Sequence, residues 1–183
     1  MKIGIIADTH GNLDGFHQAF ELLKDSDLIF HCGDLLYHGP RFDPVPSYNP
    51  RALAEAFNKC PVPIIFVKGN GDSEVDALFV KAPIQTPYAF VQIEGVRFLA
   101  THGHLEPLEK SLQQVEQWDV DYLLTAHLHV PHVERHGSVT HINPGTVTYP
   151  LAQDQSLARR TCAAIVDGLV KVWDVETGEE LSI

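Results

Sequence analysis

Aspartate, asparagine and histidine side chains recur in this sequence directly after short apolar runs. The first run, residues 2–7, is followed by Asp8 and His10. If these runs are strands of an open α/β sheet, their carboxyl ends lie at the edge where ligands bind. We therefore expect one shared site. Its predicted members are Asp8, His10, Asp34, Asn70, His102, His127 and His129.

These side chains have the composition of a transition-metal site. They supply carboxylate, amide and imidazole donors without thiolate, which suits Mn²⁺, Fe, Zn²⁺ or Ni²⁺ better than a structural zinc site. Seven ligands exceed the need of one tetrahedral ion, so we predict two divalent ions that share a bridging ligand. Such a pair keeps a net positive charge and attracts a phosphate ester. Metal ions about 3.5–4 Å apart stabilise the attacking and leaving oxygens of an in-line displacement.

The spacing within the set favours convergence on one cavity. Residues two apart in an extended chain point to the same side. Asp8 with His10, and His127 with His129, therefore form two pairs. Glycines next to several of these residues let the backbone turn sharply or approach closely.

The first third of the chain alternates predicted strands and helices. The strands are continuous apolar runs, and the first helix has apolar residues at helical spacing after a possible Asn12 cap. This alternation favours a mostly parallel sheet with helices packed against it. The predicted strands are 2–7, 27–32 and 63–68, and the predicted helices are 13–23 and 51–59.

The second half is rich in predicted strands. Turn signals at Glu94-Gly95, Gly137-Ser138 and Asp167-Gly168 indicate hairpins. We expect two sheets packed face to face with helices outside, in one domain of residues 1–183. The predicted strands are 88–93, 96–101, 121–126, 132–136, 139–142, 161–167 and 169–175, with a helix at 106–117.

Composition excludes several classes of protein. The 13 basic and 24 acidic side chains give a net charge of −11, which repels a phosphate backbone and disfavours nucleic-acid binding. No apolar run approaches the roughly 20 residues of a membrane helix, and the apolar N-terminal run is too short for a signal peptide. We therefore predict a cytoplasmic protein without membrane partners. Three cysteines without a close pair argue against a disulfide framework.

Residues 39–50 contain four prolines and cannot form a regular helix or a central strand. A loop of this length is either a lid or binding loop, or a surface insertion; the sequence leaves both open. Arg41 in this loop suits bidentate contact with phosphate, although a solvated arginine is an equal alternative. His38 lies beside it.

Together these motifs resemble the calcineurin-like metallophosphoesterases, and most closely the small bacterial YfcE-type phosphodiesterases. The resemblance covers nearly the whole chain. It implies a four-layer α/β/β/α sandwich of the metallo-dependent phosphatase type, with two packed mixed sheets flanked by helices and two metals, often manganese. The motifs are Asp8-Thr9-His10-Gly11, Gly33-Asp34, Gly69-Asn70-x-Asp72, His102-Gly103-His104, His127-x-His129, Tyr37-His38-Gly39-Pro40-Arg41 and Asn143-Pro144-Gly145-Thr146-Val147.

The resemblance also implies a role for each residue. Asp34 would bridge the metals, and a bridging hydroxide would attack phosphorus. Asp8, His10 and His129 would hold one metal, and Asn70, His102 and His127 the other. Catalytic roles would belong to Asp34, His104 and Asp72, and substrate contacts to His38, Arg41, Asn70 and His104. Asp72 would orient a ligand, or it caps a turn; His104 would contact phosphate, or it bonds a loop carbonyl.

Two positions depart from the family pattern. Gly71 stands where relatives usually have histidine or cysteine. This predicts dependence on good leaving groups, or on another acid such as His104. Ala126 replaces the usual glycine, which restricts the backbone before His127.

We predict a metal-dependent hydrolase of small phosphodiesters. A phosphomonoesterase or a nuclease is the near alternative within enzymes, and the acidic surface disfavours the nuclease. A non-catalytic scaffold, as in the small retromer subunit, is the alternative from another class, but the filled ligand positions argue against it. Exposed edge strands leave a homo-oligomer possible.

Overall fold

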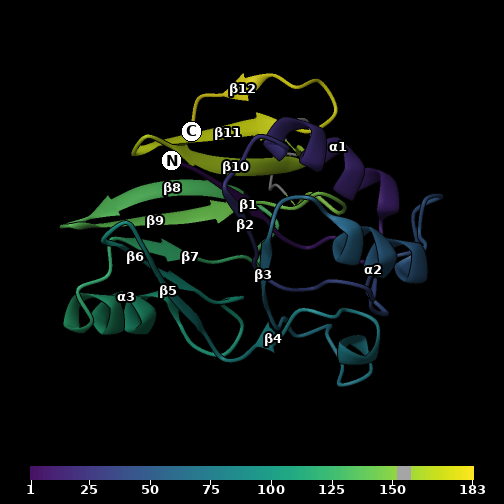
Figure 1. The fold of residues 1–183 in the computed structure, drawn as a ribbon, viewed down its shortest axis with the longest axis horizontal. Helices are drawn as coiled ribbons and strands as arrows, with labels where there is room; N and C mark the ends of the chain where they lie inside the picture. Colours follow the sequence, from purple (N-terminus) through teal and green to yellow (C-terminus); the bar gives the residue numbers. More distant parts are fainter. Residues whose placement is uncertain (152–157) are drawn as a thin grey trace.

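The computed structural model of the protein describes residues 1–151 and 158–183, and its strands form two mixed sheets (Figure 1). The first sheet contains β1 (Lys2–Ile6), β2 (Leu28–His31), β3 (Ile64–Val67), β4 (Ile84–Gln85), β10 (Thr161–Val166), β11 (Leu169–Asp174) and β12 (Glu180–Leu181), in the order β12-β11-β10-β1-β2-β3-β4. The second contains β5 (Ala89–Ile93), β6 (Val96–Ala100), β7 (Tyr122–Leu124), β8 (Pro131–His136) and β9 (Val139–Pro144), in the order β5-β6-β7-β9-β8. The helices are α1 (Leu13–Leu23), α2 (Pro50–Lys59) and α3 (Leu108–Gln117), with a 3₁₀ turn, η1, at Asp76–Leu78.

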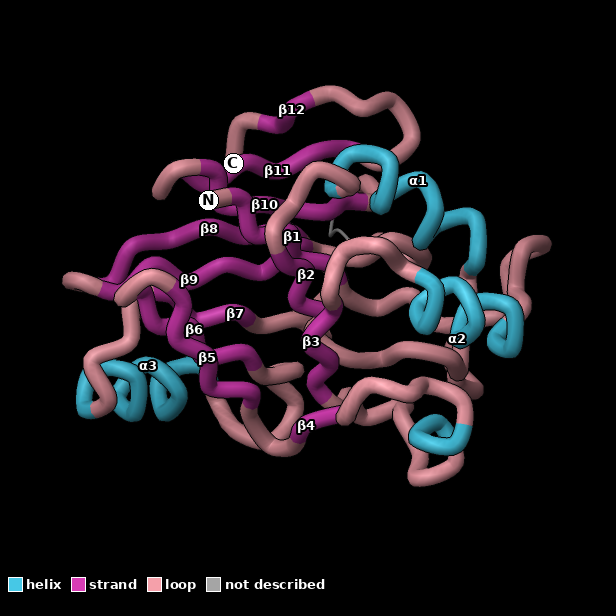
Figure 2. The backbone as a smooth tube through the Cα atoms, viewed as in Figure 1, coloured by secondary structure: helices cyan, strands magenta, loops and turns pink. Residues whose placement is uncertain are grey.

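Three clusters of buried apolar side chains separate four layers. Helices α1 and α2 pack on the first sheet, where Phe16 is part of the core. Between the sheets, the ring of Phe30 lies 5.6 Å from that of Phe98. On the outer face of the second sheet, Val115 of α3 packs with Leu123. Figure 2 shows α1 and α2 on one side of the sheets and α3 on the other. The predicted α/β/β/α sandwich is confirmed.

The sequence specifies the starts of two helices through side-chain caps. The Asn12 side chain accepts a hydrogen bond from Gly15 N at 2.9 Å and caps α1, as predicted. Asn49 accepts from Ala52 N at 3.0 Å and caps α2. Pro50 is the first residue of α2, where its missing N–H is not needed. The proline-rich loop therefore ends one residue earlier than predicted.

Parallel pairing brings the ligand-bearing loops to one edge. Strands β1, β2 and β3 are parallel neighbours, and so are β6, β7 and β9. The carboxyl ends of β1, β2 and β3 therefore lie side by side, as the sequence predicted. Strands β4 and β12 were not predicted, because two residues are too few for a periodic signal.

Two further predictions concern the chain as a whole. No helix among the described residues is long and apolar enough to cross a membrane. Cys32, Cys60 and Cys162 are all free thiols, as expected without a disulfide framework. That residues 1–183 form a single domain stays a prediction.

Candidate metal centre

Loops that follow the strands bring the predicted ligands together and bond to one another. Asp8 N donates to Gly33 O and His10 N donates to Asp34 O, both at 3.0 Å. These bonds join the loop after β1 to the loop after β2. In the second sheet, Ala126 N donates to His102 O at 3.1 Å, which joins the loops after β6 and β7.

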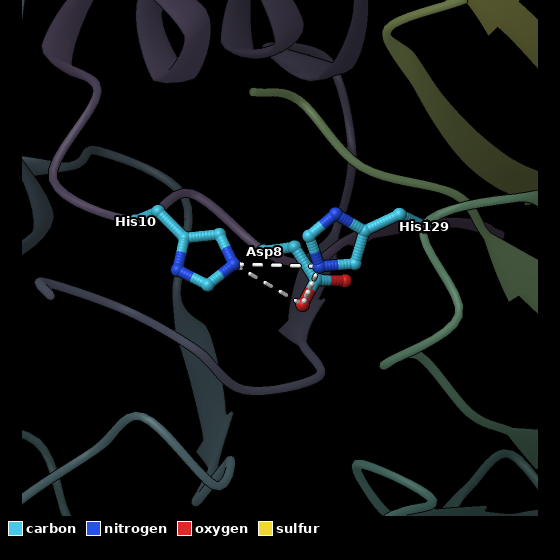
Figure 3. Close-up of side chains that lie close together, drawn as sticks. All are labelled: Asp8, His10 and His129. Atoms are coloured by element: carbon cyan, nitrogen blue, oxygen red, sulfur yellow. Dashed lines mark hydrogen bonds and ion pairs between the residues drawn. The ribbon is translucent and has the colours of Figure 1, made fainter. Parts of the chain in front are cut away.

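One group of ligand atoms comes from Asp8, His10 and His129 (Figure 3). The Nε2 atom of His129 lies 3.3 Å from Asp8 Oδ1. His10 Nε2 lies 3.8 Å from the same oxygen and 3.4 Å from His129 Nε2. All three side chains are buried. One ion could contact all three, because their ligand atoms lie within 4.8 Å of one another.

Asp34 connects this group to the remaining predicted ligands. Its Oδ2 atom lies 3.6 Å from His10 Nε2, and its Oδ1 atom lies 3.5 Å from His102 Nε2. His102 Nε2 is in turn 3.1 Å from Asn70 Oδ1. The ring of His127 lies 5.2 Å from that of His102. Each Asp34 oxygen therefore faces a different set of donors.

Backbone carbonyls set the tautomer of three of the histidines. In each ring, Nδ1 lies within hydrogen-bond distance of a carbonyl oxygen. A carbonyl only accepts, so Nδ1 carries the proton and Nε2 presents its lone pair. Contacts of this kind orient metal-binding imidazoles. The pairs are His10 with Tyr37 (2.7 Å), His102 with Cys32 (2.8 Å) and His129 with Tyr149 (2.6 Å).

Asp8 shows that the donor set fits a cation. Its carboxylate is fully buried, and neither oxygen has a hydrogen-bond partner among the described residues. Burial opposes ionisation, yet the neighbouring histidines, above all His129, hold the pKa of Asp8 below its ordinary value. A buried carboxylate without donors is costly unless it is paired or coordinates a metal. Asp8 would therefore hold one of the divalent ions.

Backbone strain is concentrated at the same edge. In the described part of the chain, eight non-glycine residues have positive φ. This conformation costs of order 1 kcal/mol or more per residue and persists where the surroundings enforce it, often at functional sites. Five of the eight are Asp8, His10, Asp34, His127 and His129.

This strain corrects two sequence-based expectations. Asp8 and His10 have φ values of 54° and 44°, so they converge because the loop curls and not because an extended strand alternates its side chains. The left-handed residue after β7 is His127 itself, with φ of 70°, rather than Ala126. Alanine at 126 is therefore compatible with the turn.

Comparison with known proteins identifies the family. Residues 1–165 match the model of the calcineurin-like phosphoesterase superfamily domain. The chain belongs to this superfamily. It is 38% identical over 152 residues to phosphodiesterase YfcE of Escherichia coli K12, covering 82% of this chain and 81% of that protein. It is 28% identical over 153 residues to phosphodiesterase MJ0936 of Methanocaldococcus jannaschii, covering 79% and 83% of the two chains.

Solved structures agree with this assignment. The structure of YfcE, described as a phosphoesterase from E. coli, matches with a TM-score of 0.84 and 28% identity, over 100% of this chain and 97% of that one. Vacuolar protein sorting 29 from Cryptosporidium parvum matches with a TM-score of 0.70 over 98% and 94% of the two chains. At 18% identity, the second likeness shows the fold alone.

In this phosphoesterase, Asp72 holds two of the loops in place. Its carboxylate accepts hydrogen bonds from the backbone N–H groups of Asp34 (2.9 Å), Leu35 (2.6 Å) and Gly69 (2.7 Å). Burial raises the pKa of Asp72 to about 6, although these donors favour the charged form. The contacts give it a positioning role, fixing Asp34 against the loop after β3.

His104 lies at the margin of the cluster. Its ring is 5.2 Å from that of His102 and 6.1 Å from that of His127. It is half-buried, and its Nδ1 atom has no hydrogen-bond partner among the described residues. This position is compatible with the predicted contact to substrate, which stays a prediction.

The proline-rich loop packs on the ligand cluster. The ring of Phe42 stacks on Tyr149 at 4.3 Å and lies 5.6 Å from the ring of His129. This contact favours a binding loop over a surface insertion. Arg41 places its guanidinium 5.3 Å from the Phe42 ring, and His38 Nδ1 faces the Gly39 and Phe42 carbonyls at 2.6 and 3.1 Å. Their predicted contacts with phosphate stay predictions.

Two threonines that were not among the predicted site residues fix the loop after β1. Thr146 Oγ1 donates to the Asp8 carbonyl at 3.1 Å, and Thr148 Oγ1 donates to the Thr9 carbonyl at 2.8 Å. Asn143, just before them, donates to the Ala126 carbonyl at 3.0 Å. The end of β9 and the segment after it thus support ligand loops from both sheets. Its only signal was the Asn-Pro-Gly-Thr motif, which favours a turn.

Proposed function

We propose that the protein hydrolyses small phosphodiesters with the aid of two divalent metal ions. The observation that carries this proposal is the carboxylate of Asp34, whose two oxygens face His10 at 3.6 Å and His102 at 3.5 Å. A carboxylate placed between two imidazole groups in this way is suited to bridging. When bound, such ions activate water and neutralise charge on phosphoryl oxygens.

The surrounding residues divide into two ligand sets and their supports. Their oxygen and imidazole donors accept manganese, our first choice, as well as iron, nickel or zinc. We expect His104 to donate to a phosphoryl or leaving oxygen, and we expect Phe42, which stacks on Tyr149 beside the His129 ring, to limit the access of water to His129. One ligand set would be Asp8, His10 and His129, and the other would be Asn70, His102 and His127. Asp34 would belong to both sets.

Three observations support a small diester as the substrate. YfcE and MJ0936 are both named phosphodiesterases. The net charge of −11 disfavours a polyanion such as a nucleic acid. All seven predicted ligand positions are filled in this chain, which disfavours a non-catalytic scaffold. A cytoplasmic location, the lack of membrane partners and a homo-oligomer stay predictions.

The test compares hydrolysis of an aryl phosphodiester with that of the matching monoester. Protein loaded with Mn²⁺ is assayed beside metal-stripped protein and the Asp34→Ala variant. Asp14→Ala removes an exposed carboxylate of α1 and serves as the matched control. We expect metal-dependent turnover that favours the diester, is lost in Asp34→Ala and is retained in Asp14→Ala.

Two results would contradict the proposal. Absence of turnover with Mn²⁺, Fe²⁺, Ni²⁺ and Zn²⁺ alike would exclude the enzyme and leave a scaffold. Turnover that favours the monoester would keep the metal centre but make the protein a phosphomonoesterase.

A further inference from the structure

A pocket of about 410 Å³ opens beside the metal centre, between the loops after β2 and β3 and the start of α2. Its wall is mainly apolar and includes Leu36, Tyr37, Tyr48, Val75 and Phe79. Pockets of this size and composition bind small molecules in proteins.

Gly71 connects this pocket to Asp34. It lines the pocket, and its N–H donates to Asp34 Oδ1 at 2.8 Å. A Cβ atom at this position would lie 3.3 Å from the same oxygen. Because glycine carries no side chain, the space between the Asp34 carboxylate and the pocket stays open. A phosphate at the metal centre could therefore extend one of its ester groups into the pocket.

The wall exposes apolar and aromatic surface to solvent. Tyr37, Val75 and Phe79 are 46%, 56% and 45% exposed. Contiguous exposed apolar surface of this kind marks a binding site more often than scattered single residues do. Aromatic side chains prefer to stack on, or meet edge to face with, other rings.

Among the polar residues that line the pocket, Arg51 supplies a positive charge next to this apolar surface. Asp76 is occupied, because it accepts hydrogen bonds from Ser73 N at 2.8 Å and Ser73 Oγ at 3.3 Å. Arg51, in the first turn of α2, forms no ion pair within the described part of the chain. A guanidinium adds attraction for the face of an aromatic ring.

We propose that this pocket selects phosphodiesters in which one ester group carries an aromatic ring. The proposal rests on the proposed function, since the metal centre must hold the phosphate. The ring would lie against Tyr37 and Phe79, with Val75 at its edge and Arg51 facing it. An alkyl ester of the same charge would gain none of these contacts.

Phenylphosphonate and methylphosphonate test the pocket without any difference in leaving group. Both are measured as inhibitors of Mn²⁺-dependent diester hydrolysis and, by calorimetry, as ligands of the Mn²⁺-loaded protein. We expect phenylphosphonate to bind about tenfold more tightly, as one stacked ring contributes roughly 1.4 kcal/mol. Phe79→Ala and Val75→Ser should bring the ratio of the two affinities close to one and leave methylphosphonate binding unchanged.

Leu78→Ala is the matched control, because Leu78 is 80% exposed and adjoins Phe79 but does not line the pocket. This variant should keep the wild-type ratio of phenylphosphonate to methylphosphonate affinity. Equal binding of the two phosphonates, or a preference that survives both pocket variants, would overturn the inference. Calorimetry needs no turnover, so failure of the pocket is distinguished from failure of the proposed function.

Discussion

Two regions of the molecule place non-glycine residues at positive φ, and they do so for different reasons. At the hairpin turns, Glu94 and Asp167 have φ values of 50° and 49°, are exposed, and are each followed by glycine. The tight turn alone demands that conformation. At the ligand edge, Asp8 and Asp34 have similar φ values of 54° and 57° but are buried.

Contacts from several segments of the fold hold the buried Asp8 and Asp34 at positive φ. Thr146 bonds the Asp8 carbonyl, and Asp72 bonds the Asp34 N–H group. The hairpins have local turns, whereas the ligand edge depends on contacts between distant segments. The same backbone angle therefore reports turn geometry in one region and enforced convergence of side chains in the other.

The largest contrast is expected between Asp8→Asn and Asp167→Asn. Asp8→Asn should lower metal-dependent turnover about a thousandfold, because it removes a buried anionic ligand. It should also destabilise the metal-free protein at neutral pH, because the neighbouring histidines hold the pKa of Asp8 below its ordinary value and so favour its charged form in the folded state. Asp167→Asn removes only an exposed ion pair with the N-terminus, 2.9 Å long, and should change neither property measurably. Steady-state kinetics measure the turnover, and thermal unfolding measures the stability. Equal turnover in the two variants would contradict the distinction between the buried and the exposed aspartate.

A second contrast compares glycines of the two regions. A Cβ at Gly33, where φ is 101°, would lie 2.6 Å from His102 Nδ1 and 2.8 Å from Gly69 N. Gly33→Ala should destabilise the fold by about 3 kcal/mol or more, through clash added to backbone strain. Gly168, with φ of 85°, has no neighbouring atom within 4 Å, so Gly168→Ala should cost only about 1 kcal/mol. Urea unfolding of the metal-free proteins measures the difference, and similar costs would contradict the comparison.

A third contrast uses pH and two histidines. Burial lowers the pKa of His31 from 6.5 to about 3. As pH falls, His31 is therefore protonated in the unfolded chain before it is protonated in the folded protein. The free energy of unfolding consequently decreases as pH falls from 6.5 towards 3. His31→Gln should therefore lose less stability than wild type between about pH 7 and about pH 4, by about 3 kcal/mol at most.

His17→Gln, on the exposed face of α1, is the control for the pH experiment. Urea unfolding of metal-free protein at both pH values measures the effect. Identical pH dependence for wild type and His31→Gln would show that His31 is not the group responsible.

The sequence predicted the layers because its long strands and helices carry clear periodicity. The seven ligand positions were also visible, since each follows an apolar run that forms a strand. The shortest strands, β4 and β12, carry no such signal. Phe42 was overlooked because one aromatic residue among prolines does not reveal that it packs beside His129.

Ring orientation could not be predicted from residue types. The Nδ1 atoms of His10 and His129 are fixed by the carbonyls of Tyr37 and Tyr149. A carbonyl is present at every position, so its use depends on the folded path of the loops. The left-handed φ of His127 is likewise a property of the loop rather than of histidine.

The central claim is that Asp34 joins two metal ions, and metal stoichiometry tests it most directly. Protein loaded with Mn²⁺ is freed of excess metal and analysed by inductively coupled plasma mass spectrometry. We expect two ions per chain in wild type and in Asp14→Asn, and at most one in Asp34→Asn. One ion or none in wild type, or two ions retained in Asp34→Asn, would contradict the account.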